Sequence, residues 1–282
     1  MYDPSLLRSN NEAREEAQKL QVAAQDVASQ LSDLDLDTLI IITPHGLAAE
    51  DDIVTYLGQC GSGYAEIGKD VIDGSVEPYL VPLNNVQLDD DLSKALWEDL
   101  RNQGCAITGL TSFGGYEDVP LRYGEIIPLS FFRPLQDNSK MKKVILSLPN
   151  RRYQQGSEMV EEMADFGSKL QESIARIFAT NRVAIIVSAD LAHTHSDCGP
   201  YGFSPSAVPF DNACSAWACT LDEKELLHTA RRLLNEAKSC GYLGLVILHG
   251  LLTEEKDSWQ CRLRAVYHPT YYGMLVSSFV RR

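Results

Sequence analysis

Residues Val183 to Phe203 read VAIIVSADLAHTHSDCGPYGF, and the fold prediction begins with these residues. Its first five residues are apolar and mostly β-branched, which is typical of a buried strand. His193 and His195 follow at once, in a chain with 6 histidines. In open α/β sheets, ligands bind just beyond the carboxyl ends of strands. The stretch therefore predicts a functional loop after a strand, although one histidine capping a turn and the other facing solvent would also fit.

A second strand end repeats this pattern. Thr38–Thr43, TLIIIT, is an apolar run that predicts a buried strand, and Pro44, His45 and Gly46 follow it directly. A single histidine after a strand is more often structural than a ligand. Two histidines at equivalent ends of parallel strands converge on the same edge of a sheet, however. We therefore expect His45 and His193 to line one crevice.

Composition limits the class of protein. The 282 residues include 25 Lys and Arg against 39 Asp and Glu, for a formal net charge of −14. An acidic surface disfavours nucleic acid and anionic membranes as partners. The sequence shows no signal-peptide pattern and no apolar run of membrane-spanning length. Its 7 cysteines include no CxxC pair, which predicts reduced thiols in a cytoplasmic protein.

Helix and strand patterns alternate along the chain. Periodicity predicts helices over residues 13–31, 92–103, 157–177 and 221–238, and strands over 38–43, 105–110, 121–134, 143–148, 183–187, 261–267 and 271–280. Residues 242–252 are apolar throughout, which leaves helix or strand open. We predict one α/β domain over residues 1–282, with a central, mostly parallel or mixed sheet flanked by helices on both faces. Residues 38–43 and 183–187 are expected to be its central strands.

The motifs SADLAHTH and GPYGF, between Ser188 and Phe203, resemble the segment that carries the catalytic histidine in LigB-like class III extradiol ring-cleavage dioxygenases and their Memo-type relatives. The PHG at residues 44–46 resembles a metal-binding segment of the same family. The resemblance implies a non-haem Fe(II) site, with His45 as a ligand and His193 as the acid/base. Another divalent metal such as zinc also fits this expectation.

The resemblance places a further ligand near the end of a helix, in the stretch NEAKSCG. Ser239 stands where the family commonly has a glutamate. Cys240 falls where Memo-type proteins have a cysteine at the metal site, and Glu236 is the nearest carboxylate, one helical turn earlier. Both are candidate ligands. Glu236 could equally be a solvated helix residue, and Cys240 a buried apolar one.

Two further positions depart from the family pattern. The family opens with a strand and an HPP motif whose histidine binds the metal, whereas Asp3 aligns there in MYDPSLL. Tyr123 replaces a pocket histidine, and a phenol does not become a cation. We therefore expect weak Fe(II) binding and slow catechol cleavage, unless an upstream segment or a partner supplies the missing histidine.

The substrate pocket is expected to include residues from the two histidine-bearing regions and from the segment around Tyr123. These candidates are Tyr123, Asp190, His195, Pro200 and Tyr201. We also expect the ring of His195 to face away from the crevice that holds His193.

Two functions follow from these patterns. The first is an extradiol dioxygenase that uses O₂ to open a small catechol or aminophenol. The alternative is a catalytically degenerate, Memo-like binding or regulatory protein, acting as a homo-oligomer or beside a homologous active subunit. His193 and GPYGF favour the enzyme. Asp3, Tyr123 and Ser239 favour the alternative.

Overall fold

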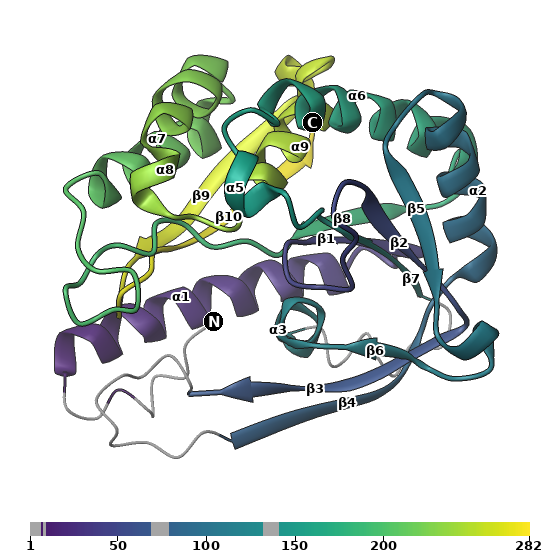
Figure 1. Ribbon diagram of the computed structural model, residues 1–282, viewed down its shortest axis with the longest axis horizontal. Helices are drawn as coiled ribbons and strands as arrows, with labels where there is room; N and C mark the ends of the chain where they lie inside the picture. Colours follow the sequence, from purple (N-terminus) through teal and green to yellow (C-terminus); the bar gives the residue numbers. More distant parts are fainter. Residues whose placement is uncertain (1–6, 8–9, 69–78, 132–140) are drawn as a thin grey trace.

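The computed structural model describes residue 7 and residues 10–68, 79–131 and 141–282 (Figure 1). The helices are α1 (Asn11–Ser32), α2 (Asp90–Asn102), α3 (Tyr123–Phe131), α5 (Arg152–Gln155), α6 (Val160–Ile177), α7 (Ala207–Thr220), α8 (Arg231–Ala237) and α9 (Tyr242–Thr253). The strands are β1 (Thr38–Thr43), β2 (Ile53–Leu57), β3 (Cys60–Ile67), β4 (Tyr79–Gln87), β5 (Ile107–Thr111), β6 (Val119–Leu121), β7 (Lys142–Ser147), β8 (Val183–Val187), β9 (Trp259–Tyr267) and β10 (Met274–Arg281). A π-helical turn over Lys224–Ala230 leads into α8, and short 3₁₀ turns cover Phe113–Gly115 and Lys256–Ser258.

The main sheet has the strand order β5–β2–β7–β1–β8 among the described residues. β1 runs parallel to β7 on one side and to β8 on the other. β2 runs parallel to β5 but antiparallel to β7, so the sheet is mixed. Every residue of β1 is buried, as expected of an unbroken apolar run covered on both faces. The predicted α/β class with a mixed sheet and surrounding helices is confirmed.

The prediction that residues 183–187 form a central strand is wrong, because β8 lies at the edge of the main sheet. Four of its five residues are partly exposed. Its two faces are nevertheless covered, since Ile185 and Ile186 pack into different apolar clusters. A run of hydrophobic residues indicates that both faces of a strand are covered. It does not indicate whether another strand pairs with each edge, because that pairing uses backbone groups.

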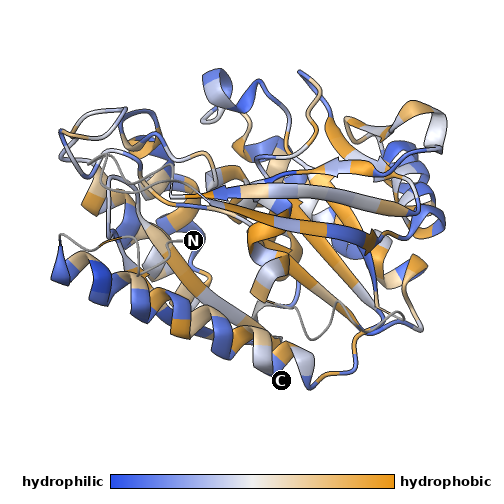
Figure 2. Ribbon diagram, turned by 90° about the horizontal axis from the view of Figure 1, so that it is seen from below, coloured by the Kyte–Doolittle hydropathy of each residue, from blue (hydrophilic) through white to orange (hydrophobic). Residues whose placement is uncertain are grey.

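Two apolar clusters lie on opposite sides of the main sheet. The larger one is formed with α2, α6, α7 and α9, and includes Leu96, Phe166, Trp217 and Ile247. α6 and α9 approach closely at Gly167, where a Cβ would lie 2.1 Å from the carbonyl oxygen of Ile247. Figure 1 shows these helices on one side of the sheet and β3, β4 and β6 on the other. Figure 2 shows hydrophobic residues along the inner strands.

The strand predicted at residues 121–134 is mostly a helix. Residues 123–131 form α3, next to a smaller sheet of order β4–β3–β6, and residues 132–134 lie outside the described part. Ile126 and Leu129 are both fully buried, and their spacing of three places them on one helical face. The carbonyl of Arg122 accepts from Glu125 and Ile126, which closes the first turn. Pro128 removes one donor from this short helix without ending it.

The carboxyl third provides a buried helix and a hairpin. Residues 242–252, which the sequence left open, belong to α9. β9 and β10 pair antiparallel in a two-stranded sheet, as the closing strands predicted. Ala17 and Leu20 of α1 pack against this hairpin in a third cluster with Val276. Among the described residues, no helix is both long and apolar enough to cross a membrane.

Candidate metal centre

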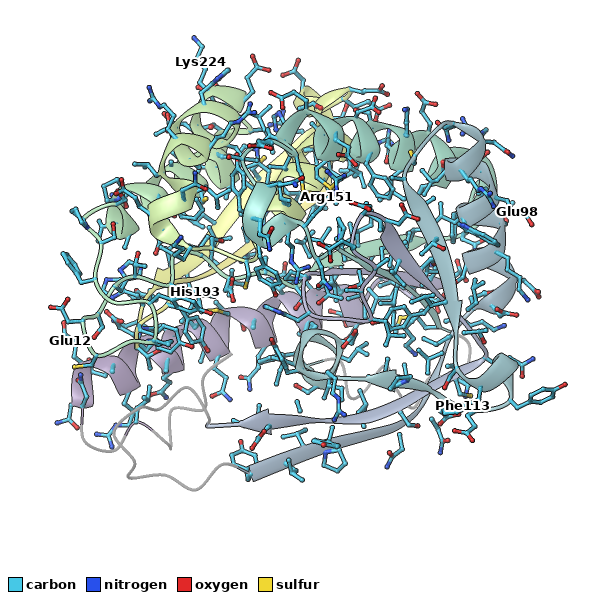
Figure 3. All side chains as sticks on the ribbon, in the orientation of Figure 1. Glu12, Glu98, Phe113, Arg151, His193 and Lys224 are labelled. Atoms are coloured by element: carbon cyan, nitrogen blue, oxygen red, sulfur yellow. The ribbon has the colours of Figure 1, made fainter. Side chains whose placement is uncertain are left out.

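The ends of β1 and β8 open into a cavity of about 2000 Å³. Its wall includes His45, Asp190, His193 and Cys240. Figure 3 shows His193 on the loop that passes above α1. The structure thus brings the histidines of the two strand ends into one cavity.

Backbone hydrogen bonds hold the loop after β8 in place. The N–H of Leu191 donates to the carbonyl of Gly273, at 2.9 Å, and the N–H of His193 donates to the carbonyl of Ala237, at 2.7 Å. The carboxylate of Asp211 accepts from the N–H of Ala192, at 2.9 Å. The loop is therefore fixed to three separate segments, which sets the positions of the side chains it carries.

A buried polar pair supports the turn that carries His45. The N–H of Leu47 donates to the hydroxyl of Tyr56, and that hydroxyl donates to Glu125, both at 2.6 Å. Glu125 is fully buried, and burial raises the pKa of its carboxyl group. Gly46 lies directly above the pair, where a Cβ would come within 2.2 Å of the Tyr56 oxygen. The close approach explains why this position holds a glycine.

The Cys240 side chain reaches the site because α8 ends at Ala237 and the chain then changes direction. Lys238 adopts the left-handed conformation, with φ of 59°, which terminates the helix. The Ser239 hydroxyl then donates to the carbonyl of Asp190, at 2.9 Å. At Gly241 a Cβ would lie 2.5 Å from the Asp190 nitrogen. This segment therefore packs tightly on the loop after β8 and directs the thiol toward Asp190.

Three different ligand types converge at this point. The Nε2 atom of His45 lies 2.9 Å from the Sγ atom of Cys240. The same sulfur lies 3.0 Å from one carboxylate oxygen of Asp190 and 3.2 Å from the other. One donor atom from each residue lies within 4.8 Å of the others, a spacing that suits a shared metal ion. Among the described residues, His45, Asp190 and Cys240 form the group with this property.

His193 flanks this group. Its Nε2 atom lies 3.0 Å from a carboxylate oxygen of Asp190 and 3.7 Å from the Cys240 sulfur. The rings of Tyr201, Tyr271 and Tyr272 surround it, with centroids 5.4, 6.1 and 5.7 Å away. The imidazole is therefore held by a carboxylate in a largely aromatic wall.

The two acidic groups of the centre are shifted in opposite directions. Burial alone would raise the pKa of Asp190, but the neighbouring His193 and His45 rings outweigh it and lower the pKa. Burial raises the pKa of the Cys240 thiol well above its usual value, and the Asp190 carboxylate raises it further. Without a metal, the centre therefore pairs an ionised carboxylate with a protonated thiol.

Comparison with known families places this centre in context. Residues 3–276 match the family described as the catalytic LigB subunit of aromatic ring-opening dioxygenase. The chain belongs to the LigB family. It is also 22% identical, over 241 residues, to a protein of Clostridium acetobutylicum whose name describes no function. That match covers 83% of this chain and 45% of the relative, so the chain spans less than half of the relative's length.

LigB dioxygenases are metal-dependent, and the group formed by His45, Asp190 and Cys240 could hold a metal ion. Asp190 was expected in the substrate pocket; it lies in the cavity wall, and it also belongs to the group that could hold a metal ion. Its position directly after β8 is the signal that could have identified it. Tyr123 lies against His45, with ring centroids 4.8 Å apart, and Tyr201 lines the cavity.

Glu236 lies outside the group formed by His45, Asp190 and Cys240. Its side chain is exposed and accepts a hydrogen bond from Ser206, at 2.5 Å. The turn at Lys238 separates it from Cys240, so spacing along the helix was misleading. Pro200 is exposed and lies outside the cavity wall. Asp3 lies outside the described residues.

His195 also lies outside the cavity wall. Its side chain is 2% exposed, and its Nε2 atom lies 2.8 Å from a carboxylate oxygen of Asp211. The ring stacks on His268, with centroids 4.1 Å apart. Residues two apart in a regular extended strand face the same side. The opposite directions of His193 and His195 therefore mean that the loop turns between them, as the bridge from His195 to Phe203 indicates.

Sequence reasoning missed two residues that follow β7. The Arg152 guanidinium donates to the carbonyls of Pro44 and Pro149 and to the hydroxyl of Tyr153. Both Arg152 and Tyr153 line the cavity. The positive charge of Arg152 opposes the rise in the pKa of the Cys240 thiol. The strand-end argument used for β1 and β8, applied to β7, would have found them.

Proposed function

We propose that this chain holds a divalent iron ion through His45, Asp190 and Cys240 and opens a small catechol or aminophenol with O₂. The observation that carries the proposal is the convergence of an imidazole, a carboxylate and a thiol within 4.8 Å, in the wall of a large cavity. Membership of the LigB family supports the reaction class.

The donor set fits a divalent transition metal. Imidazole and carboxylate suit Fe(II), and a thiolate suits iron or zinc. The short distances from the Cys240 sulfur to both other residues leave the side chains near a common centre. Iron bound there would bring the diol and dioxygen together and carry electrons between them. The family supports iron over zinc, since zinc has no redox chemistry.

The chain's own residues provide the proton chemistry. The Nε2 atom of His193 faces the Asp190 carboxylate and donates to it, so the other ring nitrogen, Nδ1, would accept the proton of a substrate hydroxyl and later return one to the opened product. The Asp190 carboxylate, 3.0 Å away, holds the imidazole and stabilises its protonated form. The aromatic wall around His193 offers flat faces for a planar substrate ring. Arg152, on the same cavity wall, favours an anionic substrate over a neutral one.

The test is anaerobic loading with Fe(II), followed by oxygen uptake with catechol and 2-aminophenol. We expect about one Fe(II) per chain, and oxygen uptake that yields a ring-opened product. Loading with Zn(II) should give bound metal without uptake. Cys240→Ser should weaken metal binding, whereas Cys219→Ser, at an exposed position away from the cavity, should not. Iron binding that is unaffected by Cys240→Ser would contradict the proposed ligand set.

A second candidate is a metal-holding, Memo-like binding or regulatory protein without ring cleavage. The observation that favours it is the ligand set itself, which has a single histidine, with Tyr123 packed against it. Oxygenases with a facial triad use two histidines and one carboxylate. Metal bound at full occupancy, with no oxygen uptake for any diol or aminophenol, would favour this candidate over the enzyme.

A further inference from the structure

Three neighbouring strands of the main sheet end near the metal centre. β7, β1 and β8 lie side by side in this order and run parallel, so their carboxyl ends meet at one edge of the sheet. His45 follows β1 in the middle, and Asp190 and His193 follow β8 on one side. The chain that follows β7, on the other side, brings Arg152 and Tyr153 into the cavity wall. The cavity wall therefore includes a tyrosine that the proposed proton chemistry does not use.

Arg152 holds Tyr153 by both its ring and its hydroxyl. The guanidinium carbon lies 4.0 Å from the centroid of the Tyr153 ring, and Nη2 donates to the phenol oxygen, at 2.6 Å. The same nitrogen donates to the carbonyl of Pro44. Nη1 donates to the carbonyls of Leu148 and Pro149, at 3.2 and 2.7 Å. Arg152 is itself buried, so a fixed group holds the phenol oxygen in position.

The Tyr153 hydroxyl has its own proton left to donate. A phenol oxygen can accept and donate at once, and here it accepts from Arg152. In the described part of the molecule, no protein acceptor lies within hydrogen-bond distance of this hydroxyl. Tyr153 is 61% exposed and lies in the cavity wall. Partial burial and the charges of Cys240 and Asp190 raise the pKa of the hydroxyl by more than Arg152 lowers it, so the group is a neutral donor.

The order of the strands distinguishes two sides of a bound substrate. A catechol or aminophenol has two adjacent polar groups on its ring. His193, after β8, would accept the proton of one of them, and the other would then point toward the end of β7, where Tyr153 lies. We propose that Tyr153 is a substrate-binding residue, which donates a hydrogen bond to an ionised ring oxygen on the side away from His193. This contact rests on the function proposed above, which supplies the substrate.

The charge of Arg152 supports this contact. Its hydrogen bonds among the described residues go to three carbonyl oxygens and one phenol oxygen, all of them neutral. A hydroxyl that accepts from a cation is polarised and becomes a stronger donor. An ionised oxygen is the acceptor that gains most from such a donor. Arg152 therefore acts through Tyr153, as a residue that positions and polarises the phenol.

The test measures ligand binding to the chain loaded with Zn(II), which has no redox chemistry. The probe is 4-nitrocatechol, whose absorbance changes when a hydroxyl ionises. Tyr153→Phe removes only the hydroxyl, and we expect the affinity for the probe to fall about tenfold. Tyr116→Phe is the matched control and should bind as the parent does, since Tyr116 is 95% exposed and lies outside the cavity wall. 4-Nitrophenol, with one hydroxyl, should bind equally to the parent and to Tyr153→Phe.

Arg152→Lys tests the positioning role. This variant keeps the positive charge and loses the planar fork that reaches the phenol and the carbonyls together. We expect it to weaken binding of 4-nitrocatechol in the parent chain and to have no further effect in Tyr153→Phe. A purely structural role would weaken binding equally in both backgrounds. Competition with a chelator for Zn(II) reports any damage to the metal centre separately, and Tyr153→Phe alone decides the contact if Arg152→Lys does not fold.

The outcomes separate this contact from the proposed reaction. Equal affinity of the parent and Tyr153→Phe for 4-nitrocatechol would overturn the contact and leave ring opening in place. An equal loss for 4-nitrophenol would contradict the assignment to the oxygen away from His193. A loss confined to 4-nitrocatechol, in a chain whose Fe(II) form takes up no oxygen, would support the contact and count against ring opening. A parent chain that binds Zn(II) but not 4-nitrocatechol would contradict both.

Discussion

Two histidine–carboxylate pairs are formed by histidines that lie two residues apart on one loop, and the surroundings of the two imidazole rings differ. His193 lies 3.0 Å from Asp190, and His195 lies 2.8 Å from Asp211. The first pair lines the cavity and adjoins the Cys240 thiol. The second pair does not line the cavity, and its imidazole stacks on His268.

The difference shows that pair geometry alone does not indicate function. Asp211 uses one oxygen for the N–H of Ala192 and the other for His195, so it ties the loop to α7. Asp190 instead contacts a thiol and an imidazole, which are themselves chemically active. We therefore propose a structural role for the pair at Asp211 and a chemical role for the pair at Asp190.

The largest expected effect is on turnover. With Fe(II) bound, His193→Gln should lower the rate of the proposed ring opening by about 10²–10⁴-fold, because it removes the proposed acid/base. Metal affinity should change little, since His45, Asp190 and Cys240 remain. Oxygen uptake per metal-loaded chain measures the effect. His195→Gln is the matched control and should retain turnover per folded molecule. Similar losses in both variants would remove the distinction between the two pairs.

Metal affinity should distinguish the two carboxylates. Asp190→Asn replaces a proposed ligand with a neutral group of the same shape. We expect the affinity for Fe(II) or Zn(II) to fall by at least the roughly 10–100-fold that loss of outer-shell support causes. Titration against a competing chelator measures it. Asp211→Asn should bind metal as tightly as the parent chain. Unchanged affinity in Asp190→Asn would exclude that side chain as a ligand.

Most of the fold could be predicted because side-chain patterns report burial. The runs in β1 and β8 and the helical spacing in α1 and α6 depend on which faces meet apolar neighbours. The edge position of β8 could not be predicted, because strands pair through backbone N–H and C=O groups, which are the same for nearly every residue type. Residues 123–131 were misread because an apolar run with a proline resembles a strand until the spacing of Ile126 and Leu129 is considered.

The strand-end argument found candidate site residues where side chains follow a strand of the main sheet, and the family resemblance added Cys240, Tyr123 and Tyr201. His45 and His193 were found by that argument, and Asp190 lies in the same position. The choice between Glu236 and Cys240 required the left-handed turn at Lys238, which changes the direction of the chain. Helical spacing cannot show such a turn. The direction of His195 likewise depended on tertiary contacts with Asp211.

The pair formed by His195 and Asp211 should contribute more to the stability of the fold than the pair formed by His193 and Asp190. Asp211→Asn leaves the His195 imidazole with an amide in place of a buried charged acceptor. We expect the free energy of unfolding to fall by about 1–3 kcal/mol. Denaturant unfolding of the metal-free chain measures it, with Asp190→Asn for comparison. A smaller loss for Asp211→Asn than for Asp190→Asn would reverse the roles we assign to the two carboxylates.

A last expected effect is a pH dependence of metal affinity that comes from Cys240, which lies beside the first pair. The thiol of Cys240 has a raised pKa and is protonated near neutral pH. Binding a metal requires the thiolate, so each bound ion releases one proton. Asp190 has a lowered pKa and is already ionised, so it adds no further proton at neutral or higher pH. Between about pH 7 and pH 8.5, affinity should rise about tenfold per pH unit.

Chelator competition with Zn(II) at several pH values measures this slope without involving oxygen. Cys240→Ser should flatten the slope, because a serine hydroxyl does not ionise in this range. Asp211→Asn should keep the full slope, since the pair with His195 contacts no ligand atom of the metal group. A parent slope near zero would mean that the thiol remains protonated when metal binds. Cys240 would then line the cavity without binding the metal. The proposed chemical role of the first pair would in that case depend on His193 alone.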